Sequence, residues 1–305
     1  MKPKLVIVLG PTGVGKSELA LELAQAIDAE IVSADSQQVY RYMDIGTNKV
    51  SGTDRARVPH HVIDVVDPDE EFNAALFRQL ATAAIEQIQG RGKNIVICGG
   101  TGLYLKALTQ GLFSGPGQDP KIRAALEAEI EERGAGALYQ RLAASDPAVT
   151  SSIHPNDRQR IIRALEVLAL TGRPLSAWQK DHGFQEKPFE AVKIGLIRDR
   201  AELNEQINRR SERMIREGFL EEVRGLTQRG FGLALKPLRS VGYRQMGAVI
   251  CGKIDLTEAA EEMKQETRRL AKRQVTWFRQ ESGIRWHHPE KERQKILQAA
   301  VAFVG

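Results

Sequence analysis

The feature that most constrains the fold of this chain is a glycine-rich segment directly after the apolar run 5–9. The segment has the P-loop pattern and reads Gly10-Pro11-Thr12-Gly13-Val14-Gly15-Lys16-Ser17. In such a loop the glycines let successive amides turn toward phosphate oxygens, the lysine supplies a mobile positive charge, and the serine hydroxyl ligates Mg²⁺. The segment therefore predicts a strand, a loop that binds a diphosphate or triphosphate group, and a helix that begins at the loop.

Alternating strand and helix patterns continue on both sides of the middle of the chain. Apolar runs predict strands at 30–34, 94–98, 192–197 and 284–287, and helical patterns lie at 17–27, 74–89, 201–217 and 256–279. This alternation is typical of an α/β protein with a parallel sheet and helices on both faces. Ligands of such sheets bind at the carboxyl ends of the strands. We therefore expect the residues that follow each strand to lie beside the P-loop.

The middle of the chain has a different pattern, with helical segments only. These segments cover 120–133, 137–144 and 157–170 and are separated by Gly, Pro and Asp turns. The expected architecture is a P-loop NTPase-like α/β core built from 1–115 and 192–305. A helical insertion domain over 116–191 interrupts this core.

Charge and cysteine content narrow the class of protein. The formal net charge is +5, and residues 193–305 carry 23 Lys/Arg against 15 Asp/Glu. This basic half favours a polyanionic partner, although a solvated surface without a partner is an equal alternative. Cys98 and Cys251 are far apart and have no zinc-ligand spacing, which favours a reducing compartment. The first apolar run is too short for a signal peptide or a membrane span, so we expect a cytoplasmic protein without a membrane partner. No exposed apolar heptad predicts an oligomer, so we expect a monomer.

Two polar residues follow predicted strands. Asp35 comes after the strand 30–34, and Thr101 lies in Gly99-Gly100-Thr101-Gly102 after the strand 94–98. A nucleotide-hydrolysing P-loop protein normally has a magnesium-organising carboxylate at the second of these positions, and this chain has none there. Asp35 is a candidate proton acceptor, with a helix cap or an outer magnesium ligand as the alternative. Thr101 is a candidate substrate contact, with a helix N-cap as the alternative.

A basic segment near the C-terminus points toward RNA. Residues 268–279 contain five basic side chains, no acid, and the aromatic residues Trp277 and Phe278. Phosphate neutralisation and base stacking are both possible on such a segment, although its apolar residues could instead belong to the core. Residues 239–244 add Arg239 and Arg244 around a glycine and a tyrosine.

Eight motifs together resemble the tRNA dimethylallyltransferase family, also called isopentenyl-tRNA or IPP transferases, in its bacterial form. They are GPTGVGKS at 10–17, SADSQQVY at 33–40, MDIGT at 43–47, PHHVID at 59–64, GGTGLY at 99–104, HPNDRQR at 154–160, RSVGYR at 239–244 and KRQVTWFR at 272–279. The motifs extend over nearly the whole chain, and several are more specific than a P-loop.

The resemblance implies a reaction. A dimethylallyl group passes from dimethylallyl diphosphate to N6 of the adenosine 3′-adjacent to the anticodon of a tRNA, diphosphate leaves, and ATP is not consumed. Residues 10–17 would bind the diphosphate together with Mg²⁺ on Ser17. Arg210 would also bind it, with Arg209 as an alternative. Asp35 would accept the N6 proton and Thr101 would position the substrates.

The resemblance also implies which residues contact the anticodon stem-loop of the tRNA. They are Asp35, Ser36, Gln37, Gln38, Thr101, Arg123, Gln159, Arg160, Arg163, Arg239, Gly242, Tyr243, Arg244, Lys272, Arg273, Gln274, Trp277 and Arg279. Two other classes of protein remain possible from the residues alone. One is an ATP-dependent small-molecule or nucleoside kinase, and the other is a non-catalytic RNA-binding module that senses nucleotide.

Overall fold

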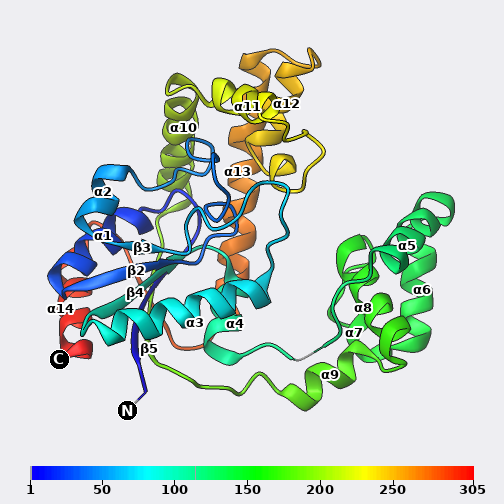
Figure 1. Ribbon diagram of the computed structural model, residues 1–305, viewed down its shortest axis with the longest axis horizontal. Coiled ribbons are helices and arrows are strands. Elements are labelled where there is room, and N and C mark those ends of the chain that lie inside the picture. The colour runs from blue at the N-terminus through cyan, green and yellow to red at the C-terminus, as the bar shows by residue number, and fades with distance from the viewer. Residues whose placement is uncertain (1, 114) are drawn as a thin grey trace. The chain divides into compact units, whose positions relative to one another are not determined.

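The computed structural model describes residues 2–113 and 115–305, which divide into two compact units. The first unit comprises 1–109 and 188–305 and contains a six-stranded sheet with the order β3-β2-β4-β1-β5-β6 (Figure 1). The strands are β1 (Lys4–Leu9), β2 (Ala29–Ser33), β3 (His60–His61), β4 (Asn94–Gly99), β5 (Glu190–Leu196) and β6 (Ile284–His287). Every pair of neighbouring strands is parallel. The α/β class with a parallel sheet is therefore confirmed.

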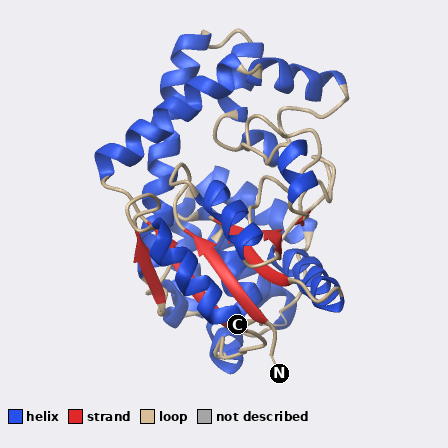
Figure 2. Cartoon of the chain, turned by 90° about the vertical axis from the view of Figure 1, so that its left-hand side faces the viewer, coloured by secondary structure: helices blue, strands red, loops and turns tan. Residues whose placement is uncertain are grey.

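Alternation along β1 explains why helices cover both faces of the sheet. Leu5, Ile7 and Leu9 pack into one hydrophobic cluster, whereas Val6 and Val8 pack into another. Successive side chains of a strand point to opposite faces, so an unbroken apolar run indicates a strand buried on both sides. Figure 2 shows the strands of this sheet, in red, running side by side with helices packed against them.

The helices of the first unit divide between the two faces. The cluster around Val6 includes buried residues of α1 and α14, and the cluster around Leu5 includes residues of α3 and α4. The helices are α1 (Lys16–Ala26), α2 (Gly52–Arg57), α3 (Ala74–Gly90), α4 (Gly102–Gln110), α10 (Arg200–Arg216), α11 (Phe219–Gln228), α12 (Tyr243–Ile250), α13 (Leu256–Arg279) and α14 (Arg293–Val304). In the described residues, no helix is long and apolar enough to cross a membrane.

The second unit, residues 110–187, is helical throughout its described part. It contains α5 (Pro120–Arg133), α6 (Ala135–Ser145), α7 (Pro147–Thr150), α8 (Arg158–Thr171) and α9 (Leu175–His182). Leu138, Leu142 and Ile161 are fully buried at the centre of its own hydrophobic cluster. The sequence-based insertion, 116–191, extends into β5, because Glu190 and Ala191 already pair with Lys4 and Leu5 of β1.

Capping residues explain where several helices begin. The Asn73 side chain accepts hydrogen bonds from the first amides of α3, and Asp119 does the same for α5, whose first residue is Pro120. Asp255 accepts from the Glu258 amide at the start of α13. Such caps satisfy amides that have no partner within the helix. This local chemistry is why the predicted starts at 74, 120 and 256 agree with the structure.

Candidate active site

The P-loop joins β1 to α1 and needs its glycines. Gly10 has a φ of 145°, and a Cβ there would lie 2.6 Å from the Leu196 carbonyl oxygen of β5. Gly13 and Gly15 have φ values of 80° and 102°, in the region that side chains disfavour. The turn brings the amides of the loop and the N-terminus of α1 to the carboxyl edge of the sheet. Backbone amides and a helix N-terminus together favour a bound anion.

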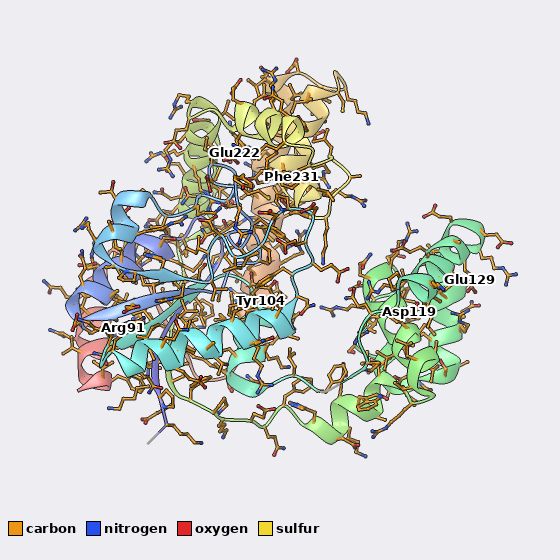
Figure 3. The ribbon with its side chains drawn as sticks, in the orientation of Figure 1. Arg91, Tyr104, Asp119, Glu129, Glu222 and Phe231 are labelled. Atoms are coloured by element: carbon orange, nitrogen blue, oxygen red, sulfur yellow. The ribbon has the colours of Figure 1, made fainter. Side chains whose placement is uncertain are left out.

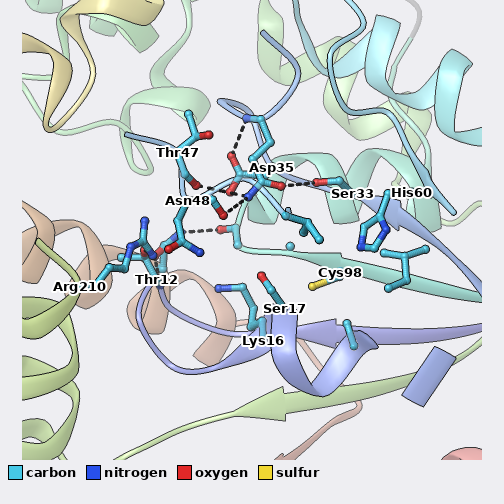
Figure 4. Close-up of a pocket in the computed structure, with 17 residues that line it drawn as sticks. Thr12, Lys16, Ser17, Ser33, Asp35, Thr47, Asn48, His60, Cys98 and Arg210 are labelled. Carbon is cyan, nitrogen blue, oxygen red and sulfur yellow. Dashed lines mark hydrogen bonds between the residues drawn. The ribbon is translucent and has the colours of Figure 1, made fainter. Parts of the chain in front are cut away.

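A pocket of about 70 Å³ lies beside this loop. Figure 4 shows Lys16 and Ser17 at the start of α1, Asp35 across the pocket, and Arg210 beside Thr12. The other lining residues are Ala20, Ile31, Ser33, Gln38, Thr47, Asn48, Val50, His60, Cys98, Gly99, Gly100 and Gln274. The pocket therefore combines two cations, a carboxylate and several hydrogen-bonding groups.

A larger cleft of about 610 Å³ shares one wall with the pocket. Lys16, Ser17, Asn48 and Arg210 line both cavities. The cleft is also lined by Gly13, Gly15, Glu18, Gln206, Arg209, Glu212, Arg213 and Arg216. The shared residues place Lys16 of the P-loop and Arg210 of α10 at the junction between a small polar pocket and a broad, mainly basic cleft.

Both pocket cations are held near the loop and are poorly solvated. Lys16 Nζ donates to the Pro11 carbonyl oxygen at 2.8 Å, and Arg210 Nη1 donates to Thr12 Oγ1 at 2.9 Å. Burial lowers the pKa of Lys16 to about 8 and that of Arg210 to about 10. A bound anion would stabilise the charged forms that burial disfavours. Arg209 is exposed and pairs with Glu205, so it is Arg210 that reaches the P-loop.

Asp35 and Thr101 lie at the ends of neighbouring strands, as expected from the parallel order. Asp35 Oδ1 accepts from the amides of Gln37 at 2.8 Å and Gln38 at 3.3 Å. Its Oδ2 makes no hydrogen bond within residues 2–113 and 115–305, so this oxygen can accept a proton or a ligand hydrogen bond. Thr101 Oγ1 accepts from the Ser36 amide at 3.1 Å. Thr101 thus fixes the backbone directly after Asp35.

Gln274 of α13 connects two walls of the pocket. Its Oε1 accepts from the Thr12 amide at 2.8 Å, and its Nε2 donates to the Gly100 carbonyl oxygen at 2.9 Å. A Cβ on Gly100 would lie 2.6 Å from that Nε2, and one on Gly102 would overlap the Trp277 indole. The glycines after β4 therefore let α13 approach the sheet edge. Trp277 Nε1 is buried and has no hydrogen-bond partner among the described residues.

The predicted RNA-contacting residues of the core differ in exposure. Lys272, Arg273, Arg279, Arg239 and Arg244 are exposed, whereas Ser36 and Gln37 are partly buried and Gln38 is buried. Gly242 and Tyr243 are buried, and Tyr243 is only 1% exposed. The Tyr243 hydroxyl donates to Glu222 Oε1 at 2.6 Å. Tyr243, for which the family resemblance implied a contact with tRNA, therefore packs inside the core.

The predicted contacts of the insertion also differ among themselves. Arg123 and Arg163 both bind Glu166, with N–O distances of 2.8 and 2.9 Å, and the Glu166 side chain is fully buried. Burial alone would raise the pKa of Glu166, but the hydrogen bonds from the two arginines lower it. Gln159 and Arg160 are exposed on α8. Two of the four residues thus contribute to the internal structure of this unit.

The pocket residues fit a magnesium ion that arrives with a diphosphate. Ser17 supplies a hydroxyl and Asp35 a carboxylate, and both line the pocket. Mg²⁺ commonly takes one or two carboxylates, waters and substrate phosphate oxygens. Within residues 2–113 and 115–305, no group of three His, Cys, Asp or Glu side chains forms a metal cage. A site completed by substrate oxygens agrees with both observations.

Sequence reasoning missed several residues that line the pocket. Thr47 and His60 belong to the motifs at 43–47 and 59–64, so those motifs could have indicated them. Asn48 directly follows a motif, while Cys98 ends an apolar strand and resembles any core residue. Burial raises the pKa of the Cys98 thiol to about 11, so this sulfur is protonated at neutral pH.

The parallel sheet, the loop between β1 and α1 and the two cations beside it define a P-loop protein of the α/β class. The chain belongs to the IPP transferase family, whose model matches residues 38–281.

Relatives cover nearly the whole chain. A tRNA dimethylallyltransferase of Geobacter metallireducens is 50% identical over 302 residues, which are 99% of this chain and 98% of the relative. A tRNA dimethylallyltransferase of Geobacter sulfurreducens is 48% identical over the full chain and 98% of its own. The crystal structure of a tRNA isopentenylpyrophosphate transferase from Bacillus halodurans matches with a TM-score of 0.73 and 38% identity, over 99% of this chain and 97% of that one. A eukaryotic dimethylallyltransferase captured acting on tRNA matches with a TM-score of 0.75 and 31% identity, over 90% and 70% of the two chains.

Proposed function

We propose that this protein transfers the dimethylallyl group of dimethylallyl diphosphate to N6 of the adenosine 3′-adjacent to the anticodon in tRNA. The observation that carries the proposal is that Lys16, Arg210 and Asp35 line the same small pocket. Membership of the IPP transferase family and relatives named tRNA dimethylallyltransferase support it. The donor is an anion that needs a phosphate cradle, and the acceptor amine has a proton to lose.

In the proposed reaction, the allylic C1–O bond breaks and its electron pair leaves with the diphosphate. The N6 lone pair forms the new N–C1 bond, and an N6 proton passes to Asp35 Oδ2. Lys16, Arg210 and the P-loop amides stabilise the charge that develops on the departing diphosphate. Ser17 would hold Mg²⁺ together with the bound donor, and the ion would supply further neutralisation of the diphosphate charge. Since an exocyclic amine is a weak nucleophile, much of the catalysis comes from orientation.

The acceptor adenosine leaves the stack of the anticodon loop before it reacts, at a cost of a few kcal/mol. Exposed cations on α13, with Arg239, Arg244 and the insertion residues Gln159 and Arg160, contact the anticodon stem-loop and offset this cost. Proteins read single-stranded RNA loops through such backbone and base-edge contacts. The protein acts as a monomer in the cytoplasm.

The direct test compares two donors. The protein is incubated with Mg²⁺, unmodified tRNA, and either allyl-labelled dimethylallyl diphosphate or γ-labelled ATP. We expect label to enter tRNA from dimethylallyl diphosphate, at the adenosine 3′ of the anticodon. Label that enters tRNA from ATP alone would support a kinase and reject the proposal. Binding of tRNA without any transfer would support a non-catalytic RNA-binding module.

Two substitutions test the assigned roles. Asp35→Ala removes the proton acceptor and should lower kcat by about 10² to 10⁴-fold, the usual contribution of a general base. Thr101→Ala should also lower kcat, because it removes the hydroxyl that accepts from the Ser36 amide and so fixes the backbone after Asp35. The dissociation constant for tRNA should change far less than kcat in both variants. The control is Asp69→Ala, which removes an exposed carboxylate that does not line the pocket. Equal losses in kcat and in tRNA affinity in the Asp35 and Thr101 variants would contradict the assignment.

A further inference from the structure

One wall of the pocket is an irregular segment, residues 42–48, and not a helix or strand. Thr47 and Asn48 at its end line the pocket, and Asn48 also lines the larger cleft. On the inner side, Gln38 Nε2 donates to the carbonyl oxygens of Thr47 and Asn48, each at 3.3 Å. The position of this segment therefore decides the shape of the junction between the two cavities.

A single carboxylate on α11 binds the middle of this segment. Glu222 Oε2 accepts from the amides of Asp44 at 2.9 Å and Ile45 at 2.5 Å, and Glu222 Oε1 accepts from the Gly46 amide at 3.1 Å. Oε1 also accepts from the Tyr243 hydroxyl at 2.6 Å. Figure 3 labels Glu222 beside α11, in the part of the first unit that also contains Phe231. Three successive amides that converge on one carboxylate leave the backbone little freedom.

The two ends of the segment are held as well. Arg213 of α10 donates to Asn48 Oδ1 at 2.8 Å. At the other end, the Tyr42 ring stacks on Phe231, with ring centroids 6.1 Å apart, and the Arg229 guanidinium lies over it at 4.6 Å. Between these ends, a Cβ on Gly46 would overlap the Phe219 and Tyr243 rings. The segment is thus attached to α10 and to α11 with the residues that follow it.

We propose that Glu222 is a positioning residue for prenyl transfer, an inference that rests on the proposed function. Glu222 does not line either cavity. It acts through the three amides of 44–46, which fix Thr47 and Asn48 at the junction where Lys16, Ser17 and Arg210 meet the donor. Tyr243 holds Glu222 in the orientation that these amides require. Glu222 and Tyr243 together thus hold the pocket wall in the shape that aligns the donor with the acceptor amine.

The test replaces the carboxylate with an amide of the same size. Glu222→Gln keeps one acceptor oxygen but turns an NH₂ group toward backbone N–H donors, so at least one amide loses its partner. We expect kcat for prenyl transfer to fall by about 10 to 100-fold, since a displacement of about 1 Å can cost 10²-fold in rate. The KM for tRNA should stay within about threefold. Hydrogen exchange of the 44–46 amides should accelerate.

Two further variants separate positioning from general stability. Tyr243→Phe keeps the buried ring and removes one of the four hydrogen bonds to Glu222, so it should give a smaller loss of kcat in the same direction. Glu221→Gln is the matched control, because Glu221 is exposed and pairs with Arg224 at 3.5 Å, away from residues 44–46. It should leave kcat and the exchange of 44–46 unchanged.

Several results would overturn the inference. Faster exchange at 44–46 in Glu222→Gln with an unchanged kcat would mean that the wall has no role in transfer. A loss of kcat without faster exchange at 44–46 would mean that Glu222 acts by another route. If Glu222→Gln fails to fold, a Tyr243→Phe variant with the kcat and exchange of the wild type would reject the proposal. A wild-type protein that transfers no prenyl group would reject the proposed function itself.

Discussion

Lys16 and Arg210 illustrate how burial prepares single residues for a charged ligand. Each is placed in a poorly solvated position that lowers its pKa, and each hydrogen-bonds to the P-loop itself. Without a bound anion, nothing offsets the desolvation cost of these two cations, and the proposed diphosphate would offset it. The burial of Lys16 and Arg210 should therefore strengthen the binding of an anion beside the P-loop.

The lowered pKa of Lys16 makes donor binding depend on pH. The folded value of about 8 lies below the ordinary value of 10.5, so Lys16 loses its proton as the pH rises through about 8. We expect the dissociation constant of dimethylallyl diphosphate to be flat near pH 7. It should rise above pH 8, toward about tenfold per pH unit. The measurement is isothermal titration calorimetry of dimethylallyl diphosphate binding at pH values from about 7 to about 9.5.

Lys16→Ala is the control for this dependence, because it also reports any ionisation of the ligand. The variant should bind weakly at every pH and lack the inflection near pH 8. The effect on stability has the opposite sign to that on binding. Because the unfolded chain keeps the Lys16 proton at higher pH than the folded chain, stability should increase between pH 8 and 10.5. If the inflection of the dissociation constant near pH 8 persists in Lys16→Ala, a group other than Lys16 causes it.

At the scale of elements, α13 serves two sides of the molecule at once. Its inner side places Gln274 on the P-loop and Trp277 against Gly102, while Lys272, Arg273 and Arg279 remain exposed. A 24-residue helix can do both because its faces repeat every 3.6 residues. One helix therefore contributes both to the wall of the pocket and to the exposed basic surface.

Removing the exposed charges of α13 should weaken tRNA binding and make it less dependent on salt. Each phosphate contact contributes close to one unit to the slope of log K against log salt. We expect the Lys272→Ala, Arg273→Ala, Arg279→Ala triple variant to reduce that slope by about two to three units. The measurement is tRNA affinity at salt concentrations from about 50 to about 300 mM. Lys295→Ala on α14 should behave as the wild type; an unchanged slope in the triple variant would exclude this surface.

Several helices and strands could be predicted from sequence, and the shortest strand could not. The bounds predicted for α5, α13 and β6 agree with the structure, since periodicity and caps define long or isolated elements. The strand β3 is only two residues long, so it has no alternation to detect. It exists because Ile31 and Val32 of β2 pair with His60 and His61.

The same distinction applies to the site. Lys16, Asp35 and Arg210 were placed by motifs, and parallel topology predicted that the ends of β2 and β4 lie near the P-loop. Glu222 could not be found in this way, because its amide partners lie more than 170 residues earlier in the chain. The burial of Tyr243 could not be predicted from its motif, because it depends on packing against Phe219, 4.9 Å away between ring centroids.

At the scale of the whole molecule, the insertion has the features of an independent folding unit. Its described helices share one core, and Glu166 with Arg123 and Arg163 ties α5 to α8 inside it. Domains of this kind have their own hydrophobic core and can fold alone. The insertion should therefore keep its structure when the rest of the chain is absent.

We expect the fragment 110–187 to give a helical circular dichroism spectrum and a cooperative thermal transition. Leu142→Asp places a charge at a fully buried position of its core and should abolish the transition. Leu170→Asp changes the same residue type on α8, where the side chain is 38% exposed, and should leave the transition nearly unchanged. A fragment without helical signal would show that the insertion depends on the core.

The position of β1 in the sheet also matters during synthesis on the ribosome. β1 lies between β4 and β5, and β5 begins only at Glu190, after the whole insertion. A nascent chain that ends at residue 109 contains the strands β1 to β4, which can form the sheet β3-β2-β4-β1. The edge of β1 that later pairs with β5 then has no partner strand. An open edge of a hydrophobic strand is a template for wrong pairing. The insertion therefore sets how long the growing chain must be protected, and chaperone demand should fall once residues 190–196 have emerged.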